Sequence, residues 1–171
     1  NFSQVTNPPI DSLRENKVMS LKTRFGNLGN ILDFDNLTEE NIYVLDSPIL
    51  TNSQFKKFKK FFSKKIKTID CTFDIQNSLK DRIEAIREEA ETAVREGGTC
   101  IVLSDKNFSN QKASIPSILT VGAVHSHLVK HGLRGYCSLN VECSDAMDTH
   151  SFAILIGVGA TTVNPYLAID S

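Results

Sequence analysis

The 171-residue sequence has no long apolar run and almost no net charge. No stretch approaches the roughly 18 apolar residues of a transmembrane helix, and no basic segment followed by an apolar one resembles a signal peptide. We therefore expect a soluble chain. Its 19 basic and 20 acidic residues leave a net charge of −1. This balance gives no general attraction to nucleic acid or to an anionic membrane, so neither is expected as a partner.

The sequence also lacks paired-cysteine and phosphate-binding glycine motifs. None of its four cysteines lies in a Cys-x-x-Cys spacing, and three fall in expected strands, where buried thiols are common; they are Cys71, Cys100, Cys137 and Cys143. We expect reduced thiols and an intracellular protein. The glycines near Gly26 and Gly29 do not have the Gly-x-Gly-x-x-Gly or P-loop spacing, so a plain loop is favoured there over a phosphate-binding loop.

Short apolar segments alternate with helical patterns along most of the chain, and 40% of the residues are hydrophobic, enough for one domain with its own core. Each expected strand but the last is followed by a helix; the strands begin near Ile42, Lys67, Thr99, Tyr136 and Thr161. Strands joined by helices of this length pair in parallel. We predict an α/β fold of βαβ units with a mainly parallel sheet, either open and Rossmann-like or a partial barrel.

The first 35 residues differ from this α/β body. Pro8 and Pro9 fix their own backbone angles, which predicts an extended strap over Asn1–Ile10, and Asp11 can cap a helix running to Leu21. We expect a single domain over residues 1–171, with the strap and helix in 1–35 and the α/β body in 36–171. The start at Asn1, without an initiator methionine, suggests a piece of a longer protein.

Two helices between the early strands have clear apolar faces. Thr51 or Ser53 can cap a helix whose phenylalanines recur on one side, at Phe55, Phe58, Phe61 and Phe62. Its six lysines fall on the other side, and we favour a solvated face over a nucleic-acid patch; they are Lys56, Lys57, Lys59, Lys60, Lys64 and Lys65. Ser78 begins a second amphipathic helix that ends at Gly97.

Polar residues follow the expected strands, and in parallel sheets ligand groups gather at the carboxyl ends of strands. This rule selects five residues: Asp46, Asp74, Asp105, Glu142 and Asn164. They could hold a cation or orient a substrate. The favoured interpretation is that they cap helices or bind loop amides, because no phosphate-binding glycine loop accompanies them.

The histidines give no complete metal or catalytic motif. His125 and His127 are two residues apart on a helix and point in nearly opposite directions, whereas His127 and His131 are four apart and could share a metal. A third ligand would have to come from elsewhere, for example His150 or Cys143. We favour the interpretation that the histidines pack against other residues or are solvated at the surface. Burial in strands argues against Cys100 or Cys137 as an activated nucleophile.

Long segments of the chain resemble the central domain of the glutamate synthase large chain. They are FSQVTNPPIDSLRE (2–15), VMSLKTRFGNLGNIL (18–32), LDSPIL (45–50), IPSILTVGAVHSHLVKHGLR (115–134) and HSFAILIGVGATTVNPYLA (150–168). The resemblance is collinear over nearly the whole chain. It implies a fragment of an enzyme that makes two L-glutamate from L-glutamine and 2-oxoglutarate, in the cytoplasm or in a plastid.

By this resemblance, the catalytic groups lie in other domains of the parent chain: a glutamine amidotransferase, and an FMN-binding synthase domain with an iron–sulfur cluster. A small electron-transfer subunit or ferredoxin would supply electrons. This fragment would carry no cofactor and no catalytic residue; it would connect the two active sites and help to wall an ammonia channel. The expected channel lining is the strap, where proline removes competing donors and carbonyls stay unpaired: Thr6, Asn7, Pro8, Pro9 and Ile10. The alternative is a stand-alone α/β nucleotide- or metal-binding domain.

Overall fold

The computed structural model describes residues 12–25 and 43–170. The chain divides into two compact units, residues 1–47 and 48–171, and each is described by itself. The expected strap, with the channel residues from Thr6 to Ile10, lies outside the described residues. The division of one domain into 1–35 and 36–171 stays a prediction.

The described part of the first unit holds a short helix and a two-stranded sheet. Helix α1 spans Ser12–Val18 and is shorter than the pattern predicts. Strands β1 (Thr23–Phe25) and β2 (Tyr43–Leu45) pair antiparallel. We expected the strand that ends at Leu45 to belong to the parallel sheet, and this was wrong. A three-residue strand has too short a pattern to reveal its partner.

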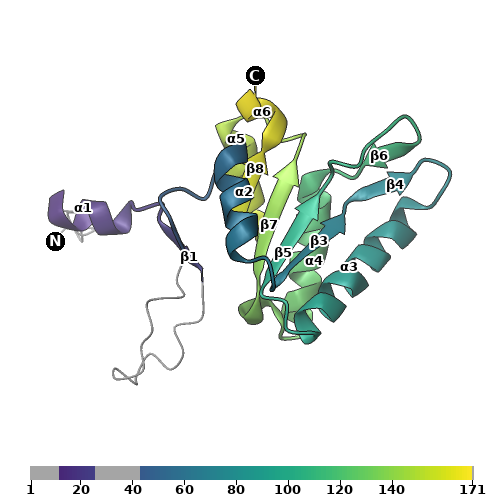
Figure 1. Ribbon diagram of the computed structural model, residues 1–171, viewed down its shortest axis with the longest axis horizontal. Coiled ribbons are helices and arrows are strands. Elements are labelled where there is room, and N and C mark those ends of the chain that lie inside the picture. The colour runs from purple at the N-terminus through teal and green to yellow at the C-terminus, as the bar shows by residue number, and fades with distance from the viewer. Residues whose placement is uncertain (1–11, 26–42, 171) are drawn as a thin grey trace, which may run out of the picture. The chain divides into compact units, whose positions relative to one another are not determined.

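A four-stranded parallel sheet forms the centre of the second unit, which confirms the predicted α/β class; the sheet is open and not a barrel (Figure 1). The strand order is β3-β5-β7-β8. The strands are β3 (Ile66–Asp70), β5 (Cys100–Ser104), β7 (Ser138–Cys143) and β8 (Thr162–Pro165). The sheet continues at the β8 edge as a short parallel bridge, where Leu50 N donates to Val163 O and Val163 N donates to Pro48 O, both at 2.9 Å.

Helices cover the sheet. The crossover helices α3 (Leu79–Arg95), α4 (Ser117–Lys130) and α5 (Thr149–Val158) lie side by side, with α4 in contact with both others. Figure 1 shows α2 (Asn52–Phe61) in front of the sheet and α4 behind it. A turn of 3₁₀ helix, Arg134–Tyr136, precedes β7, and α6 (Tyr166–Asp170) follows β8 directly. No helix among residues 12–25 and 43–170 is long and apolar enough to cross a membrane.

The expected strand Lys67–Phe73 is in fact two strands. After β3, the strand β4 (Thr72–Asp74) leaves the parallel sheet and pairs antiparallel with β6 (Lys112–Ser114), which the sequence did not suggest. Asp70 favours this turn, because its Oδ1 accepts hydrogen bonds from the backbone N and the hydroxyl of Thr72 at 3.0 and 2.8 Å. Asp74 therefore does not lie at the carboxyl edge of the parallel sheet.

The core lies between the parallel sheet and its crossover helices. Every residue of β5 is buried, as expected for a central parallel strand covered on both faces. The apolar face predicted for α3 is confirmed at Ile86, Ala90 and Ala93, and Val94 is buried as well. On α2, Thr51 is the N-cap in a capping box with Gln54. Phe55 and Phe58 are buried, but Phe61 is 49% exposed, so the expected face was too wide.

Candidate functional site

The structure brings three of the five predicted strand-end residues together at the carboxyl edge of the sheet. Glu142 on β7 lies opposite Asn164 on β8 and Ser104 on β5 in the parallel register. Asp105 follows β5 and donates its backbone N–H to Glu142 O at 3.2 Å. The other two, Asp46 and Asp74, lie elsewhere: after β2 in the first unit and in β4. We call the group around Asp105, Glu142 and Asn164 the rim.

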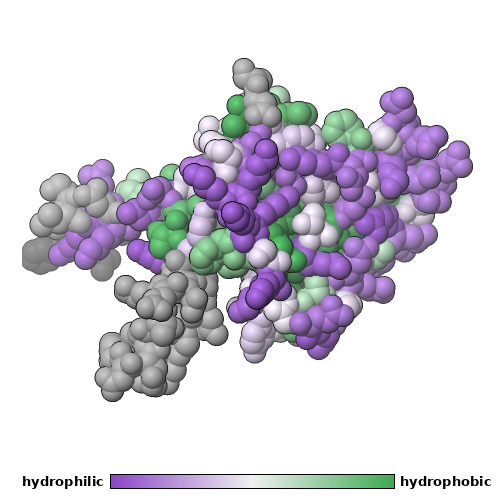
Figure 2. All heavy atoms as spheres, in the orientation of Figure 1, coloured by the Kyte–Doolittle hydropathy of each residue, from purple (hydrophilic) through white to green (hydrophobic). Residues whose placement is uncertain are grey.

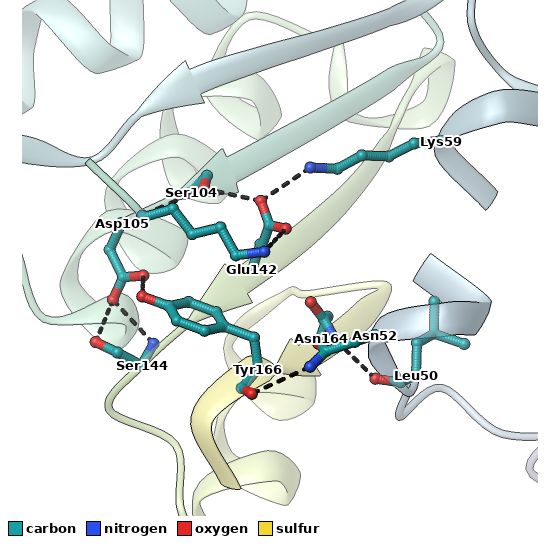
Figure 3. Close-up of polar contacts among 10 residues, drawn as sticks. Leu50, Asn52, Lys59, Ser104, Asp105, Glu142, Ser144, Asn164 and Tyr166 are labelled. Carbon is teal, nitrogen blue, oxygen red and sulfur yellow. Dashed lines mark hydrogen bonds and ion pairs between the residues drawn. The ribbon is translucent and has the colours of Figure 1, made fainter. Parts of the chain in front are cut away.

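Glu142 is the charged centre of the rim. Its side chain is only 5% exposed, yet Lys59 Nζ from α2 and Lys106 Nζ both lie 2.9 Å from its carboxylate oxygens (Figure 3). The Ser104 hydroxyl donates to Glu142 Oε2 at 2.8 Å. Burial alone would raise the pKa of Glu142, but the hydrogen bonds from Lys106 and Lys59 outweigh it and hold the pKa below its ordinary value. Glu142 is thus an ionised group whose charge is already balanced.

Asp105 is the second buried carboxylate, at 4% exposure. Its Oδ2 accepts from the Ser144 backbone N–H at 2.9 Å, the Ser144 hydroxyl at 2.6 Å and the Ser114 hydroxyl at 3.1 Å. Its Oδ1 accepts from the Tyr166 hydroxyl at 2.9 Å. Burial and this bond to Asp105 raise the pKa of Tyr166. The tyrosine is therefore a neutral donor and a poor general base.

Asn164 joins the start of α2 to the end of the sheet. Its Nδ2 donates to Leu50 O at 2.9 Å and to Asn52 Oδ1 at 3.0 Å, and Asn52 Nδ2 donates to Tyr166 O at 3.2 Å (Figure 3). Asn164 Oδ1 is buried without a hydrogen-bond partner in the part of the chain that the structure describes. The two hydrogen bonds that Asn164 Nδ2 donates thus fix the orientation of this side-chain amide.

Lys59 and Tyr166 are rim residues that the sequence reasoning missed. Lys59 was placed with the solvated lysines, and Figure 2 shows hydrophilic side chains over α2. However, Lys59 lies four residues after the inward-facing Phe55, and its ammonium group sits 4.8 Å from the centre of that ring. Because residues four apart share a helix face, the sequence could have distinguished Lys59 from the outward-facing lysines. No sequence signal points to Tyr166.

The histidines fall into separate environments, as the spacing predicts. His127 and His131 share a face of α4 and meet Glu91 of α3, whereas His125 lies beside Arg134, whose Nε donates to its Nδ1 at 3.2 Å. Burial and the Arg134 charge lower the pKa of His125. The third member of the His127 group is therefore Glu91, and neither His150 nor Cys143 takes that place.

The four cysteines are free and buried, in agreement with the expectation of reduced thiols. Burial, as the largest cause, raises the pKa of Cys71, Cys100 and Cys143 to about 12. The pKa of Cys137 is raised by burial as well. Thiols with such pKa values are almost wholly protonated at neutral pH, so they are poor nucleophiles.

Comparisons with known proteins agree with the resemblance. The glutamate synthase central domain family model matches residues 1–171. A glutamate synthase [NADPH] large chain of Azospirillum brasilense is 53% identical over 174 residues, which cover 100% of this chain and 11% of that relative. A ferredoxin-dependent glutamate synthase of Pyropia yezoensis is 41% identical over 174 residues, covering 99% of this chain and 11% of the relative.

A glutamate synthase [NADPH] large chain of Bacillus subtilis is 40% identical over 173 residues, with 98% of this chain and 11% of the relative covered. The chain thus spans only 11% of the length of these relatives. The match to the family model extends over every residue of the sequence. The chain therefore belongs to the glutamate synthase central domain family.

Proposed function

We propose that this chain is a non-catalytic part of a glutamate synthase, which converts L-glutamine and 2-oxoglutarate to two molecules of L-glutamate. In this proposal it connects the glutamine amidotransferase domain to the FMN-binding synthase domain and sets the distance between their active sites. The observation that carries the proposal is the closure of the rim by its own hydrogen bonds and ion pairs. The carboxyl edge of a parallel sheet is where an α/β enzyme would bind its substrate.

The two carboxylates of the rim are occupied by neighbouring hydrogen-bond donors. Glu142 accepts from two ammonium groups and a hydroxyl, and Asp105 accepts four hydrogen bonds. A general base needs a free lone pair directed at a substrate, and both oxygens of each of these carboxylates already accept from neighbouring groups. The arrangement suits a structural clamp that fastens α2 and α6 to the sheet.

The alternative of a nucleotide-binding domain fits this edge poorly. Phosphate groups bind where backbone N–H groups and positive charge converge, usually at a glycine-rich turn. Here two buried carboxylates, Asp105 and Glu142, occupy the ends of the central strands. The two lysines nearby, Lys59 and Lys106, are paired with Glu142, so a phosphate would have to displace them from that carboxylate.

The strap is proposed to line the ammonia channel at Thr6, Asn7, Pro8, Pro9 and Ile10. The support comes from the sequence: the two prolines carry no N–H donor, and an extended segment leaves carbonyl groups available to a small neutral molecule. We infer that no redox cofactor binds to this chain. FMN and an iron–sulfur cluster would lie in other domains of the parent chain.

The reductant of the parent enzyme would reach the flavin domain through a small electron-transfer subunit or ferredoxin. The names of the relatives support both routes, since one group is NADPH-linked and another ferredoxin-dependent. We propose a cytoplasmic location, or a plastid if the source is a photosynthetic eukaryote, as in the chloroplastic relative from Spinacia oleracea.

The test of the scaffold role uses the full-length enzyme with Glu142→Gln. Glutamine hydrolysis and ammonia-dependent glutamate formation are assayed separately. Both should stay within a few-fold of wild type, because the carboxylate touches neither reaction. A loss of about 100-fold or more in either half-reaction, in a variant whose thermal unfolding shows a folded protein, would assign Glu142 to catalysis and reject the proposal.

The channel is tested with Thr6→Trp in the same enzyme. A bulky side chain in the channel wall should leave glutamine hydrolysis intact while free ammonia accumulates and less glutamate forms per glutamine. Asn110→Trp, at an exposed position in the turn before β6, is the matched control. If glutamine hydrolysis and glutamate formation stay coupled in Thr6→Trp, the proposal that the strap lines the channel is wrong.

A further inference from the structure

Three side chains with metal-binding donors meet where the ends of helices α3 and α4 lie together. Glu91 comes from α3, His127 from the last turn of α4, and His131 is the C-cap of α4. Their ligand atoms all lie within 4.8 Å of one another. Among the described residues this is the only such group of three histidine, cysteine or acidic side chains. We call it the Glu91 cluster.

The distances within the Glu91 cluster are close to those of a metal site. His127 Nε2 lies 2.6 Å from Glu91 Oε2, and His131 Nδ1 lies 3.9 Å from the same oxygen. The two imidazole ring centres are 4.3 Å apart. Ligand bonds of about 2.1 Å in a tetrahedral site place ligand atoms about 3.4 Å from one another. Side-chain shifts of less than about 1 Å would therefore admit an ion.

The carboxylate of Glu91 is held in place by a neighbouring side chain. Arg95 Nε and Nη2 lie 2.8 and 2.7 Å from Glu91 Oε1, which leaves Oε2 facing the histidines. Outer hydrogen bonds of this kind orient the ligands of metal sites. The hydrogen bonds from Arg95 and His127 also lower the pKa of Glu91, so the carboxylate is ionised at neutral pH. The Arg95 charge opposes cation binding, which favours a metal that binds imidazole strongly.

His131 can turn toward an ion without leaving a backbone group unpaired. Its Nδ1 lies 2.8 Å from His127 O. The same carbonyl also accepts the backbone N–H of His131 at 3.2 Å. When Nδ1 binds a metal, the carbonyl keeps this second hydrogen bond. The end of α4 therefore keeps its backbone hydrogen bond when the His131 ring moves.

The supporting helices are well fixed below the cluster. On α3, Ala90 and Val94 lie within one helical turn of Glu91 and are buried; on α4, Val124 and Leu128 are buried in the same core cluster. The side chains of Glu91, His127 and His131 remain 21, 14 and 35% exposed. Buried neighbours thus hold the two helices in place, and the side chains of the cluster remain accessible to solvent.

We propose that the Glu91 cluster binds a divalent transition-metal ion, with zinc as its test ion, through Glu91, His127, His131 and a water molecule. Two nitrogens and one carboxylate oxygen are a donor set that zinc accepts in tetrahedral sites. The ion joins the end of α3 to the end of α4. Its effect is structural: it holds two crossover helices together on the outer layer of the sheet.

The test follows hydrogen–deuterium exchange by mass spectrometry in the full-length protein, with micromolar free zinc and without it. Zinc should slow exchange in peptides covering residues 86–95 and 124–133, because the ion ties these helix ends together. In His131→Gln the zinc concentration needed for this protection should rise by at least about tenfold, since one ligand is lost. Glu91→Gln should have the same effect and leaves the histidines in place.

His150→Gln is the matched control, because His150 is an exposed histidine on α5 outside the cluster. It should retain the zinc-dependent protection. Exchange across β5 and β7 without zinc should be the same in every variant, which establishes that each one is folded. The proposal is overturned if zinc protects neither helix end in wild type, or if His131→Gln and Glu91→Gln respond to zinc as wild type does.

Discussion

The ammonium group of Lys59 on α2 lies 2.9 Å from the carboxylate of Glu142 on β7, although the two residues are 83 positions apart. This contact closes the carboxyl edge of the sheet with a helix that precedes every strand of the sheet in the sequence. Lys106, the second lysine partner of Glu142, approaches the other carboxylate oxygen from the loop after β5. One buried carboxylate thus joins three segments of the second unit.

Replacing Lys59 should weaken the fold of this unit. Lys59→Met keeps an unbranched side chain and removes one of the two ammonium groups on Glu142, so we expect a loss of about 1–2 kcal/mol in the free energy of unfolding. Lys56→Met, at an exposed lysine of the same helix, should change it by less than about 0.5 kcal/mol. Urea unfolding of residues 1–171 measures both. Equal effects of the two variants would contradict a special role of Lys59.

The rim should also make stability depend on pH. Glu142 has a pKa below its ordinary value of 4.5, since the lysine hydrogen bonds outweigh the effect of burial. A lowered folded-state pKa stabilises the protein fully above pH 4.5, and this stabilisation is lost as the pH falls through the folded-state pKa. Melting temperatures measured from neutral to acidic pH should fall more steeply for wild type than for Glu142→Gln. Parallel curves would show that Glu142 contributes nothing to the acid sensitivity.

Gly159 should be intolerant of any side chain. Its φ of +128° lies in a region that favours glycine, and an added Cβ would overlap the His125 ring. Gly159→Ala should therefore lower the free energy of unfolding by more than about 2 kcal/mol. Gly157→Ala is the matched control two residues earlier in α5, where an added Cβ meets no atom within 4 Å. It should stabilise the helix by up to about 1 kcal/mol. Thermal unfolding of the two variants checks the contrast, and a harmless Gly159→Ala would refute it.

The buried cysteines should resist alkylation in the folded protein. Cys71, Cys100 and Cys143 have pKa values of about 12, so their reactive thiolate is scarce near neutral pH. Peptide mass spectrometry after iodoacetamide treatment should find these residues unmodified in the native protein and modified in urea. Rapid labelling of any of them without denaturant would show that the thiol is accessible and activated.

The sequence predicted the elements whose patterns are long. The apolar period of α3 and the continuous apolar run of β5 identify a covering helix and a central strand, and both are as expected. It located the three-residue strand β2 but not its partner, and it did not predict the β4–β6 pair, because so few residues carry no period and their partners depend on turns.

The candidate sites were predicted only in part for a related reason. The strand-end rule found Asp105, Glu142 and Asn164, because position along a strand is a local property. It could not supply Lys59, which reaches Glu142 from a helix remote in the sequence, and the histidine spacing could not supply Glu91, which reaches His127 from α3. Which helix face meets which strand end is decided by packing of the whole unit.

The segment from Pro48 to Leu50 has a consequence for self-association. By pairing with Val163, it occupies the N–H and the carbonyl that this residue of the edge strand β8 would otherwise offer to another chain. Pro48 of this segment has no N–H to offer to a further strand. At the opposite edge, β3 carries the exposed Lys67, whose charge opposes the docking of a second sheet. Both margins of the sheet are thereby protected against the strand-to-strand polymerisation that leads to aggregation.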